Sequence, residues 1–286
     1  MNRLVAGSCA GPEAGLASAY VALKVKTLEL LYAEKTRTAV ARQIALIGGR
    51  KLQYDDFARE LATRQVRAEK SITKLNALRT SYLGYLAAQC RMSMDALNEL
   101  LAEALGDRAL PRFAAPVPDE VPAALLLERA DINLSATLYG VDPRELLDGS
   151  IGPEEEMQDI AALGNPLYVR AVVQARQQVS AALRRLRVQS SIADAAYMRV
   201  VNAKAEFESS KRSHARAEIS EVQLMEDFQS LLLDLNVLGA ANGELALAWI
   251  VLMGSIGNGA SIEANLSSQT VQSPLLHKVS RKLRNP

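Results

Sequence analysis

The chain has 286 residues, with 33 basic side chains against 32 acidic ones. This balance leaves no overall positive field, so we expect no nucleic-acid partner. Aromatic residues make up 5% of the chain and hydrophobic residues 49%. Long helices packed side by side need few bulky aromatic anchors, because small residues let their backbones approach closely. The composition therefore favours a coiled coil or an extended helical array.

The N-terminal residues give no convincing signal peptide. Leu4 to Ser8, ahead of Cys9, superficially resemble a lipoprotein cleavage site. The apolar run before that site is about three residues, whereas a signal peptide needs roughly 7–15. Cys9 and Cys90 are the two cysteines of the chain, too few for a disulfide framework. The most apolar stretch, Leu245 to Ile256, is about twelve residues, short of the roughly twenty of a membrane-spanning helix.

Residues 1–110 predict a first helical hairpin. A helix is expected from about Glu13 to Ile47, with an apolar side marked by Leu16, Tyr20, Leu23, Leu30 and Leu31. A turn follows at Gly48, Gly49, Arg50, Lys51 and Leu52. The second helix carries one apolar face, formed by Phe57, Leu61, Ala68, Ile72, Leu75, Leu78, Tyr82 and Leu86.

Residues 111–167 differ in character from the helices on either side. Four prolines between Pro111 and Pro122 predict an extended linker. From Ile132 to Tyr139 apolar and polar residues alternate with period two, which predicts a short β-strand that ends before Gly140. Gly149 to Pro166 is expected to be a loop with at most one short helix.

Residues 168–260 predict a second helical hairpin. Apolar or small residues recur at the first and fourth positions of six heptads, which is typical of a left-handed coiled coil. The first positions are Val172, Val179, Leu186, Ala193, Val200, Phe207 and His214, and the fourth are Ala175, Ala182, Gln189, Ala196, Ala203 and Ser210. Arg184, Arg185 and Arg187 fall off this seam, on an expected solvated face. After a turn near 216–220, a second helix is expected to run to Gly254–Gly259.

Residues 261–286 predict a disordered polar and basic tail, with Lys278, Arg281, Lys282 and Arg284 near its end. Two interpretations remain open for these charges: a solvated tail, or a basic contact for lipid headgroups or peptidoglycan. The fold class that follows from the whole pattern is mainly α. It consists of two long antiparallel helical hairpins, related by an internal repeat, with at most a short β segment between them.

Catalytic constellations are missing from the sequence, so we predict neither an enzyme nor a cofactor. His214 and His277 are the two histidines, and His214 occupies a heptad position. No cysteine or histidine cluster has the spacing of a metal site, so no metal is expected. Gly48–Gly49 lacks the further glycines and the Lys-Ser/Thr ending of a phosphate loop. The candidate functional sites are therefore contact surfaces of the protein.

Four stretches resemble the TolC-like outer-membrane efflux family. Residues 121–132, ending in Arg129-Ala130-Asp131-Ile132, are similar to a linker that ends in Arg-Pro-Asp-Ile. Residues 168–186 are similar to the start of the family's second long helix, and 242–250 to its closing helix. Residues 217–220 resemble the hairpin tip, with Ala217 where a glycine is usual.

The resemblance implies a function as well as a fold. It implies a homotrimer whose helices form a periplasmic tunnel, a location in the outer membrane and periplasm, and transport by efflux or type I secretion. It also implies partners: a periplasmic adaptor protein and an inner-membrane pump. The adaptor-contact tips would be Gly48, Gly49, Arg50, Lys51, Leu52, Ala217, Glu218, Ile219 and Ser220. The tunnel constriction would fall on Gln223 and Glu226, the former lacking a carboxylate.

Departures from the family leave a second hypothesis open. The family supplies two β-hairpins per subunit to a membrane barrel, whereas the interval from Asp131 to Tyr168 is short for one such hairpin and its helix. A single predicted strand is likewise short of what a barrel needs. The chain is therefore predicted to be either the tunnel-forming part of a channel subunit, or a soluble helical scaffold derived from that family.

Overall fold

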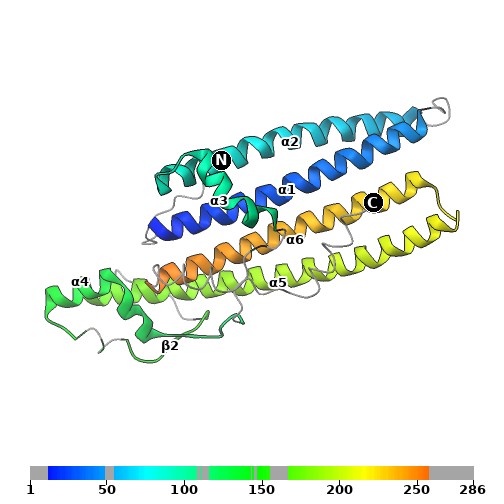
Figure 1. Cartoon of the computed structure of the whole chain (residues 1–286). Helices are drawn as coiled ribbons and strands as arrows, with labels where there is room; N and C mark the ends of the chain where they lie inside the picture. The colour runs from blue at the N-terminus through cyan, green and yellow to red at the C-terminus, as the bar shows by residue number, and fades with distance from the viewer. Residues whose placement is uncertain are drawn as a thin grey trace. The chain divides into compact units, whose positions relative to one another are not determined.

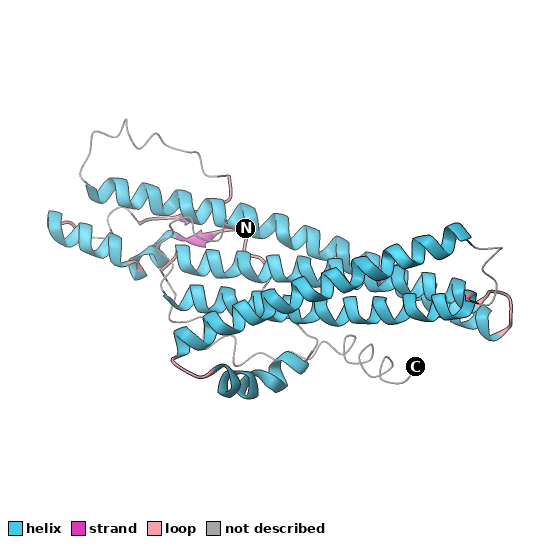
Figure 2. Cartoon of the chain, turned by 90° about the horizontal axis from the view of Figure 1, so that it is seen from above, coloured by secondary structure: helices cyan, strands magenta, loops and turns pink. Residues whose placement is uncertain are grey.

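The computed structural model describes residues 12–48, 55–107, 110, 116–142, 144, 147–154 and 167–257. The described residues are 85% helical, against about one third for an average soluble domain, which confirms the mainly α prediction. The elements in chain order are α1 (Pro12–Ile47), α2 (Asp55–Cys90), α3 (Met94–Gly106), β1 (Val121–Pro122), η2 (Ala123–Glu128), α4 (Ala130–Tyr139), β2 (Ser150–Ile151), α5 (Leu167–Ala215) and α6 (Glu221–Ser255) (Figures 1 and 2).

The chain divides into two compact units. Unit 1 comprises Met1–Ser18, Pro111–Ser191 and Glu244–Pro286, and unit 2 comprises Ala19–Leu110 and Ile192–Gly243. The long helices α1, α5 and α6 each contribute residues to both units.

Unit 2 contains arms of both predicted hairpins. In the first, Val40 and Ile47 of α1 pack in one buried cluster with Leu61 of α2. In the second, the Phe207 ring of α5 lies 5.3 Å from the Phe228 ring of α6. Nearer the start of α5, Arg199 pairs with Asp234, which lies further along α6. Contacts earlier in α5 are made with residues later in α6, so α5 and α6 are antiparallel.

The heptad pattern correctly identified the buried face of α5. The first-position residues from Val172 to Val200 are each at most 9% exposed. Fourth-position Ala175, Ala182, Ala196 and Ala203 are buried as well. Phe207 and His214 are half-buried toward the C-terminal end of the helix. Small side chains at every other layer let a neighbouring helix approach α5 closely.

One glycine marks a close approach of helices within unit 2. A Cβ atom added at Gly243 of α6 would lie 2.5 Å from a methyl carbon of Val25 on α1. The same atom added at Gly239, one turn earlier, would meet nothing within 4 Å. Because valine has few rotamers and Val25 is buried, the contact at Gly243 requires the absence of a side chain.

Unit 1 has a core that joins α5, α6 and the 116–154 segment. Tyr168, Leu183 and Leu186 of α5 are almost completely buried with Leu252 of α6 and Ile132 of α4. In that segment, β1 pairs with β2 in an antiparallel register that sets Val121 opposite Ile151. This pair of short strands is the whole sheet among the described residues.

Polar side chains of α5 hold the 116–154 segment by its backbone. Arg176 donates to the carbonyl oxygens of Asp148 and Ser150, and Ser180 donates to that of Pro153 at 3.1 Å. Arg184 donates to Pro153 as well, and Arg187 to the carbonyl and carboxylate of Asp119. Arg184 and Arg187 are exposed, as expected for residues off the seam. Spacings of three and four residues place these donors on one side of α5, where they also reach the backbone of the segment.

The predicted strand at Ile132–Tyr139 is wrong, because these residues form α4. Ile132, Ser135 and Ala136 are the buried residues, which is helical spacing, while Leu134 and Leu138 are exposed. Gly140 ends the helix with a φ of +63°, and the Val141 N–H donates to the Ala136 carbonyl as in a Schellman cap. In a ten-residue segment with leucines on two faces, the apolar residues fit the period of two of a strand and the period of 3.6 of a helix equally well. The alternation of apolar and polar residues therefore could not distinguish a strand from a helix.

Helix α3 was not anticipated as a separate element within residues 1–110. Ser93 accepts a hydrogen bond from the Ala96 N–H, and Leu97 is the buried residue of its first turns. Helix α6 is long and apolar enough to cross a membrane by length and composition, yet 56% of its most apolar window is buried inside the protein. The core helix of a soluble protein passes the same test, so α6 is read as a core helix.

The substitution Leu186→Asp tests the buried seam of α5. Leu186 is completely buried, so an aspartate there is expected to cost roughly 3–5 kcal/mol of the free energy of unfolding. Val188, two residues along, is 56% exposed, and Val188→Asp is expected to cost no more than about 0.5 kcal/mol. Urea unfolding followed by circular dichroism measures both. Equal losses for the two variants would contradict the assigned seam.

Candidate functional site: the hairpin tip and its polar cluster

The second hairpin tip is a closed turn of five residues between α5 and α6. The Glu218 N–H donates to the Ser213 carbonyl and the Ala217 N–H to the His214 carbonyl, both at 2.9 Å. This is the Schellman pattern, whose left-handed position falls on Ala217 with a φ of +58°. The resemblance to the efflux family expects a glycine here. Alanine makes the same turn at the cost of backbone strain.

Further hydrogen bonds fix the rest of the turn. Ser220 Oγ accepts from the Gln223 N–H and caps the first turn of α6. His214 Nδ1 donates to the Ile219 carbonyl at 3.1 Å, and Arg216 pairs with Glu218 at 3.0 Å. Ala217, Glu218 and Ser220 are exposed while Ile219 is half-buried. The tip is thus an ordered surface whose backbone is satisfied from within.

The first tip is described at one of its predicted residues. Gly48 follows the last turn of α1 and is exposed. Gly49, Arg50, Lys51 and Leu52 lie outside the described residues. The assignment of these four to an adaptor contact stays a prediction from the sequence.

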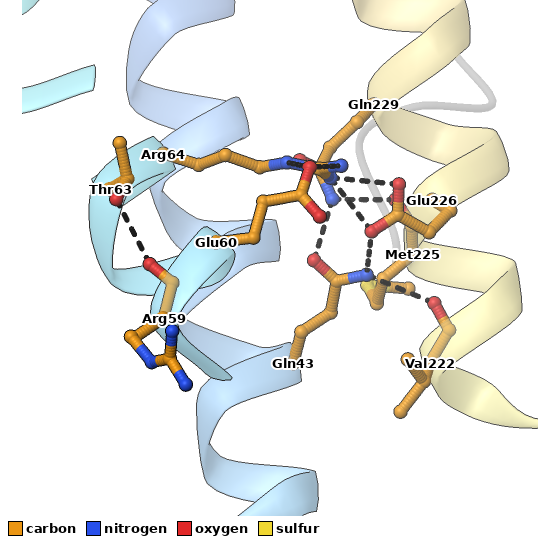
Figure 3. Close-up of polar contacts among 9 residues, drawn as sticks. All are labelled: Gln43, Arg59, Glu60, Thr63, Arg64, Val222, Met225, Glu226 and Gln229. Carbon is orange, nitrogen blue, oxygen red and sulfur yellow. Dashed lines mark hydrogen bonds and ion pairs between the residues drawn. The ribbon is translucent and has the colours of Figure 1, made fainter. Parts of the chain in front are cut away.

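Close to the tips, five polar side chains form one hydrogen-bonded group, the tip cluster, which consists of Gln43, Glu60, Arg64, Glu226 and Gln229 (Figure 3). Gln43 of α1 is completely buried. Its Nε2 donates to Glu226 at 2.8 Å and to the Val222 carbonyl at 3.1 Å, and its Oε1 accepts from Gln229 at 2.7 Å. A buried amide with its donors and acceptor used stabilises the packing of α1 against α6.

Arg64 connects α2 to the same carboxylate. Its Nη1 lies 2.8 Å from both oxygens of Glu226, and its Nη2 lies 2.6 Å from Glu60 on its own helix. The hydrogen bond to Glu226 is the main cause that raises the pKa of Arg64. The charge of Glu226 is therefore matched by a guanidinium of the same chain, and the tip cluster joins α1, α2 and α6 within unit 2.

A second ion pair lies nearer the turn. Arg42 Nε lies 2.7 Å from one oxygen of Glu221, and Arg42 Nη2 lies 3.2 Å from the other. The hydrogen bond from Arg42 lowers the pKa of Glu221. Glu221 also stands in the first turn of α6, where a negative charge is favoured by the helix dipole. The pair adds a solvated link between α1 and the beginning of α6.

The two residues predicted for the constriction have different surroundings. Gln223 is exposed and its amide donates to Asp227 at 2.9 Å. Glu226, three residues later, is half-buried in the tip cluster. Sequence reasoning missed Gln43, Arg64 and Gln229, since a polar residue on a helix gives no sign of which neighbouring helix it will face. Their common signal was weak: each is polar near an apolar face.

A different buried polar site, in unit 1, involves the Arg-Ala-Asp-Ile stretch. Arg129 is 4% exposed, and its guanidinium binds both carboxylate oxygens of Asp131 at 2.7 and 3.0 Å. Its Nη1 donates to Gln178 of α5 at 2.9 Å and to the Ser255 carbonyl of α6 at 2.7 Å. The hydrogen bond from Arg129 lowers the pKa of Asp131. Arg129 thereby fixes α4 to α5 and satisfies a carbonyl at the C-terminal end of α6.

The end of α6 is shaped to fit Arg129. Gly257 has a φ of +86°, and a Cβ atom there would lie 2.8 Å from the Arg129 backbone nitrogen. Both the backbone conformation and the close contact require glycine. Within the tip cluster the polar groups bind one another, and the same is true within the Arg129 site. Among the described residues no group of His, Cys, Asp and Glu could hold a metal ion. Both sites are therefore sets of contacts that hold helices together.

Ala217→Gly is expected to stabilise the protein. The substitution removes the strain of a left-handed alanine, which outweighs the added backbone entropy by about 0.5–1 kcal/mol. Ala205 is an exposed residue inside α5. Ala205→Gly is the matched control and is expected to destabilise by about 1 kcal/mol. Thermal unfolding of the two variants gives the comparison. A loss of stability in both would mean that the turn does not hold Ala217 in this conformation.

A double-mutant cycle of Arg64→Ala and Glu226→Gln measures the strength of the tip cluster. Both side chains are less than one third exposed, so a coupling free energy of about 1–2 kcal/mol is expected. The matched cycle uses Arg185 and Glu244, whose side chains are 47% and 52% exposed, and should give between 0 and about 0.5 kcal/mol. Similar values from both cycles would show that Arg64 and Glu226 are as solvated as a surface pair.

Comparisons with known proteins bear on this arrangement. Neither the protein-family models nor the curated protein sequences give a match to this sequence. Solved structures do match the fold. One match is a crystal structure of CusC from work on its folding and transmembrane channel formation. It has a TM-score of 0.60 at 15% identity, over 85% of this chain and 76% of that one.

Two further matches have similar values. The outer-membrane channel OprN has a TM-score of 0.60 at 15% identity, over 86% of this chain and 65% of its own. The Campylobacter jejuni outer-membrane channel CmeC has a TM-score of 0.52 at 13% identity, over 93% of this chain and 67% of its own. At these identities the likeness is one of fold. Over most of its length, the chain has the TolC-like fold of these outer-membrane channel proteins.

Proposed function

We propose that the chain is a subunit of a trimeric TolC-like channel for efflux or type I secretion, in which it forms the periplasmic helical tunnel. The observation that carries this proposal is the fold likeness to outer-membrane channels, which extends over at least 85% of the chain. Transport through a tunnel needs shape and surface chemistry, and it needs no nucleophile or base. The helix-locking contacts described above suit a passive conduit.

Exposed apolar residues support association between copies. Leu233 and Val237 lie one turn apart on α6 and are 62% and 36% exposed, and Val251 further along is 41% exposed. On α5, Val188 and Ile192 are 56% and 47% exposed, again one turn apart. Rows of apolar residues at helical spacing favour burial against another helix. In a ring of copies, each row would pack against a neighbouring subunit.

The tips are the proposed contact with a periplasmic adaptor of an inner-membrane pump. The second tip presents Ala217, Glu218 and Ser220 on an ordered turn, which would limit the entropy lost on binding. Gln223 and Glu226 remain the proposed constriction. Arg64 is shared by Glu226 and Glu60, so two carboxylates and one guanidinium leave a net negative charge in each copy, and a ring of three copies would be negative. We therefore propose that the mouth narrows by packing and favours cations over anions.

The alternative, a soluble helical scaffold with the same fold, makes different predictions. The channel proposal expects the chain in the envelope fraction of its host cell, and a particle of three times the 31.0 kDa chain mass after extraction. A monomer at micromolar concentration, found wholly in the soluble fraction, would instead support the scaffold.

The substitution Leu233→Arg tests the proposed contact between copies. A charge in the exposed apolar row of α6 is expected to shift the particle from trimer to monomer without unfolding it. Met198→Arg, at an exposed position on α5 outside both rows, adds the same charge and should leave the trimer intact. Light scattering gives the mass and circular dichroism confirms the fold. An unchanged mass for Leu233→Arg would remove α6 from the interface.

A further inference from the structure

Helix α4 in unit 1 is apolar on two sides, and described residues cover one of them. Ile132, Ser135 and Ala136 face the core. On the other side, Leu134 and Leu138 lie one turn apart and are 64% and 71% exposed, and Tyr139 beside them is 45% exposed. These are among the most exposed large apolar side chains in the described part of the chain. A face of this kind favours burial by another apolar surface.

The described chain ends next to this helix. Gly257 is the last described residue, and its missing Cβ would lie 2.8 Å from the backbone atoms of Glu128 and Arg129. Arg129 immediately precedes α4. Residues 258–286 therefore leave the described structure at the base of α4.

The sequence of that segment contains an amphipathic pattern. Ser273 and Pro274 are a favourable N-cap and first position for a helix. After them, apolar residues follow helical spacing and fall within one narrow stripe: Leu275, Leu276, Val279 and Leu283. Arg281 and Arg284 fall on the opposite side, and Lys278 and Lys282 flank the stripe. We name residues 274–285 the tail segment.

Charge supports α4 as the partner for the tail segment. Residues 274–286 contain four basic residues and no acidic one. Glu128 before α4 and Asp142 after it are exposed carboxylates, and Arg144 is exposed as well. The two carboxylates at the ends of α4 attract basic side chains of a helix that lies along it.

We propose that the tail segment docks on α4, with its Leu275–Val279–Leu283 stripe against Leu134, Leu138 and Tyr139, and its basic side chains near Glu128 and Asp142. The reach is sufficient, because the sixteen residues between Gly257 and Pro274 extend to on the order of 50 Å. Helix α4 is only about 15 Å long. The docked segment covers the apolar face that the described residues leave open. This interaction does not depend on the channel proposal.

Disulfide trapping in the full chain tests the docking. In a Cys9→Ser, Cys90→Ser background, Leu138→Cys is combined with Val279→Cys and the protein is mildly oxidised. An intramolecular disulfide is expected, since apposed side chains meet the short Cβ separation that a disulfide needs. The control pairs Leu138→Cys with Arg281→Cys on the opposite side of the stripe, and should form at least about fivefold less. A disulfide between chains would show that a second copy covers α4 and would overturn the proposal. Trapping no better than the control would overturn it too.

Hydrogen exchange gives an independent readout in the otherwise unaltered chain. Val279→Asp is expected to increase the exchange rate of α4 amides severalfold, because docking then no longer protects the helix. Ser280→Asp introduces the same charge off the stripe and should leave α4 exchange unchanged. The proposal requires both the trapping and the exchange results. A lipid surface is the competing partner of the stripe. If the chain sediments with phosphatidylglycerol vesicles, loses that binding on Val279→Asp and forms no intramolecular disulfide, the stripe binds lipid and docking on α4 is refuted.

Discussion

The structure depends most on the continuous buried seam of α5. From Val172 to Ala203 its first and fourth heptad positions are buried except for half-buried Gln189, and they belong to both compact units. Alternation of branched and alanine side chains sets how closely neighbouring helices approach, and the spacing of seven sets which face they use. Burial of that face fixes which residues lie on the other sides of α5. One side holds the 116–154 segment by its backbone carbonyls, and another exposes Val188 and Ile192.

Polar contacts add specificity to this apolar packing. Gln43 and Arg64 meet Glu226 in unit 2, while Arg129 meets Asp131, Gln178 and the end of α6 in unit 1. Removing one partner would leave a buried polar group unsatisfied, which is costlier than the net gain of forming the pair. Such contacts therefore restrict sliding of one helix along another, which apolar side chains alone tolerate.

Much of the fold could be predicted from the sequence, because it rests on long periodic patterns. The expected helix from Glu13 to Ile47 is observed from Pro12 to Ile47, and the α5–α6 turn lies where the motif placed it. Short elements were harder. The ten residues of α4 fit two periods, and the choice depended on a core that the local sequence does not contain. The tip cluster was missed for the same reason, since Gln43 and Glu226 are far apart in sequence and each resembles a surface residue.

Electron cryomicroscopy of the full chain, extracted from the envelope of its host cell, tests the central claim most directly. The account predicts a particle with threefold symmetry, in which α5 and α6 of each copy line a tunnel and the Ala217 turns gather at one end. Particles that hold a single chain, or copies arranged without a shared axial tunnel, would contradict it.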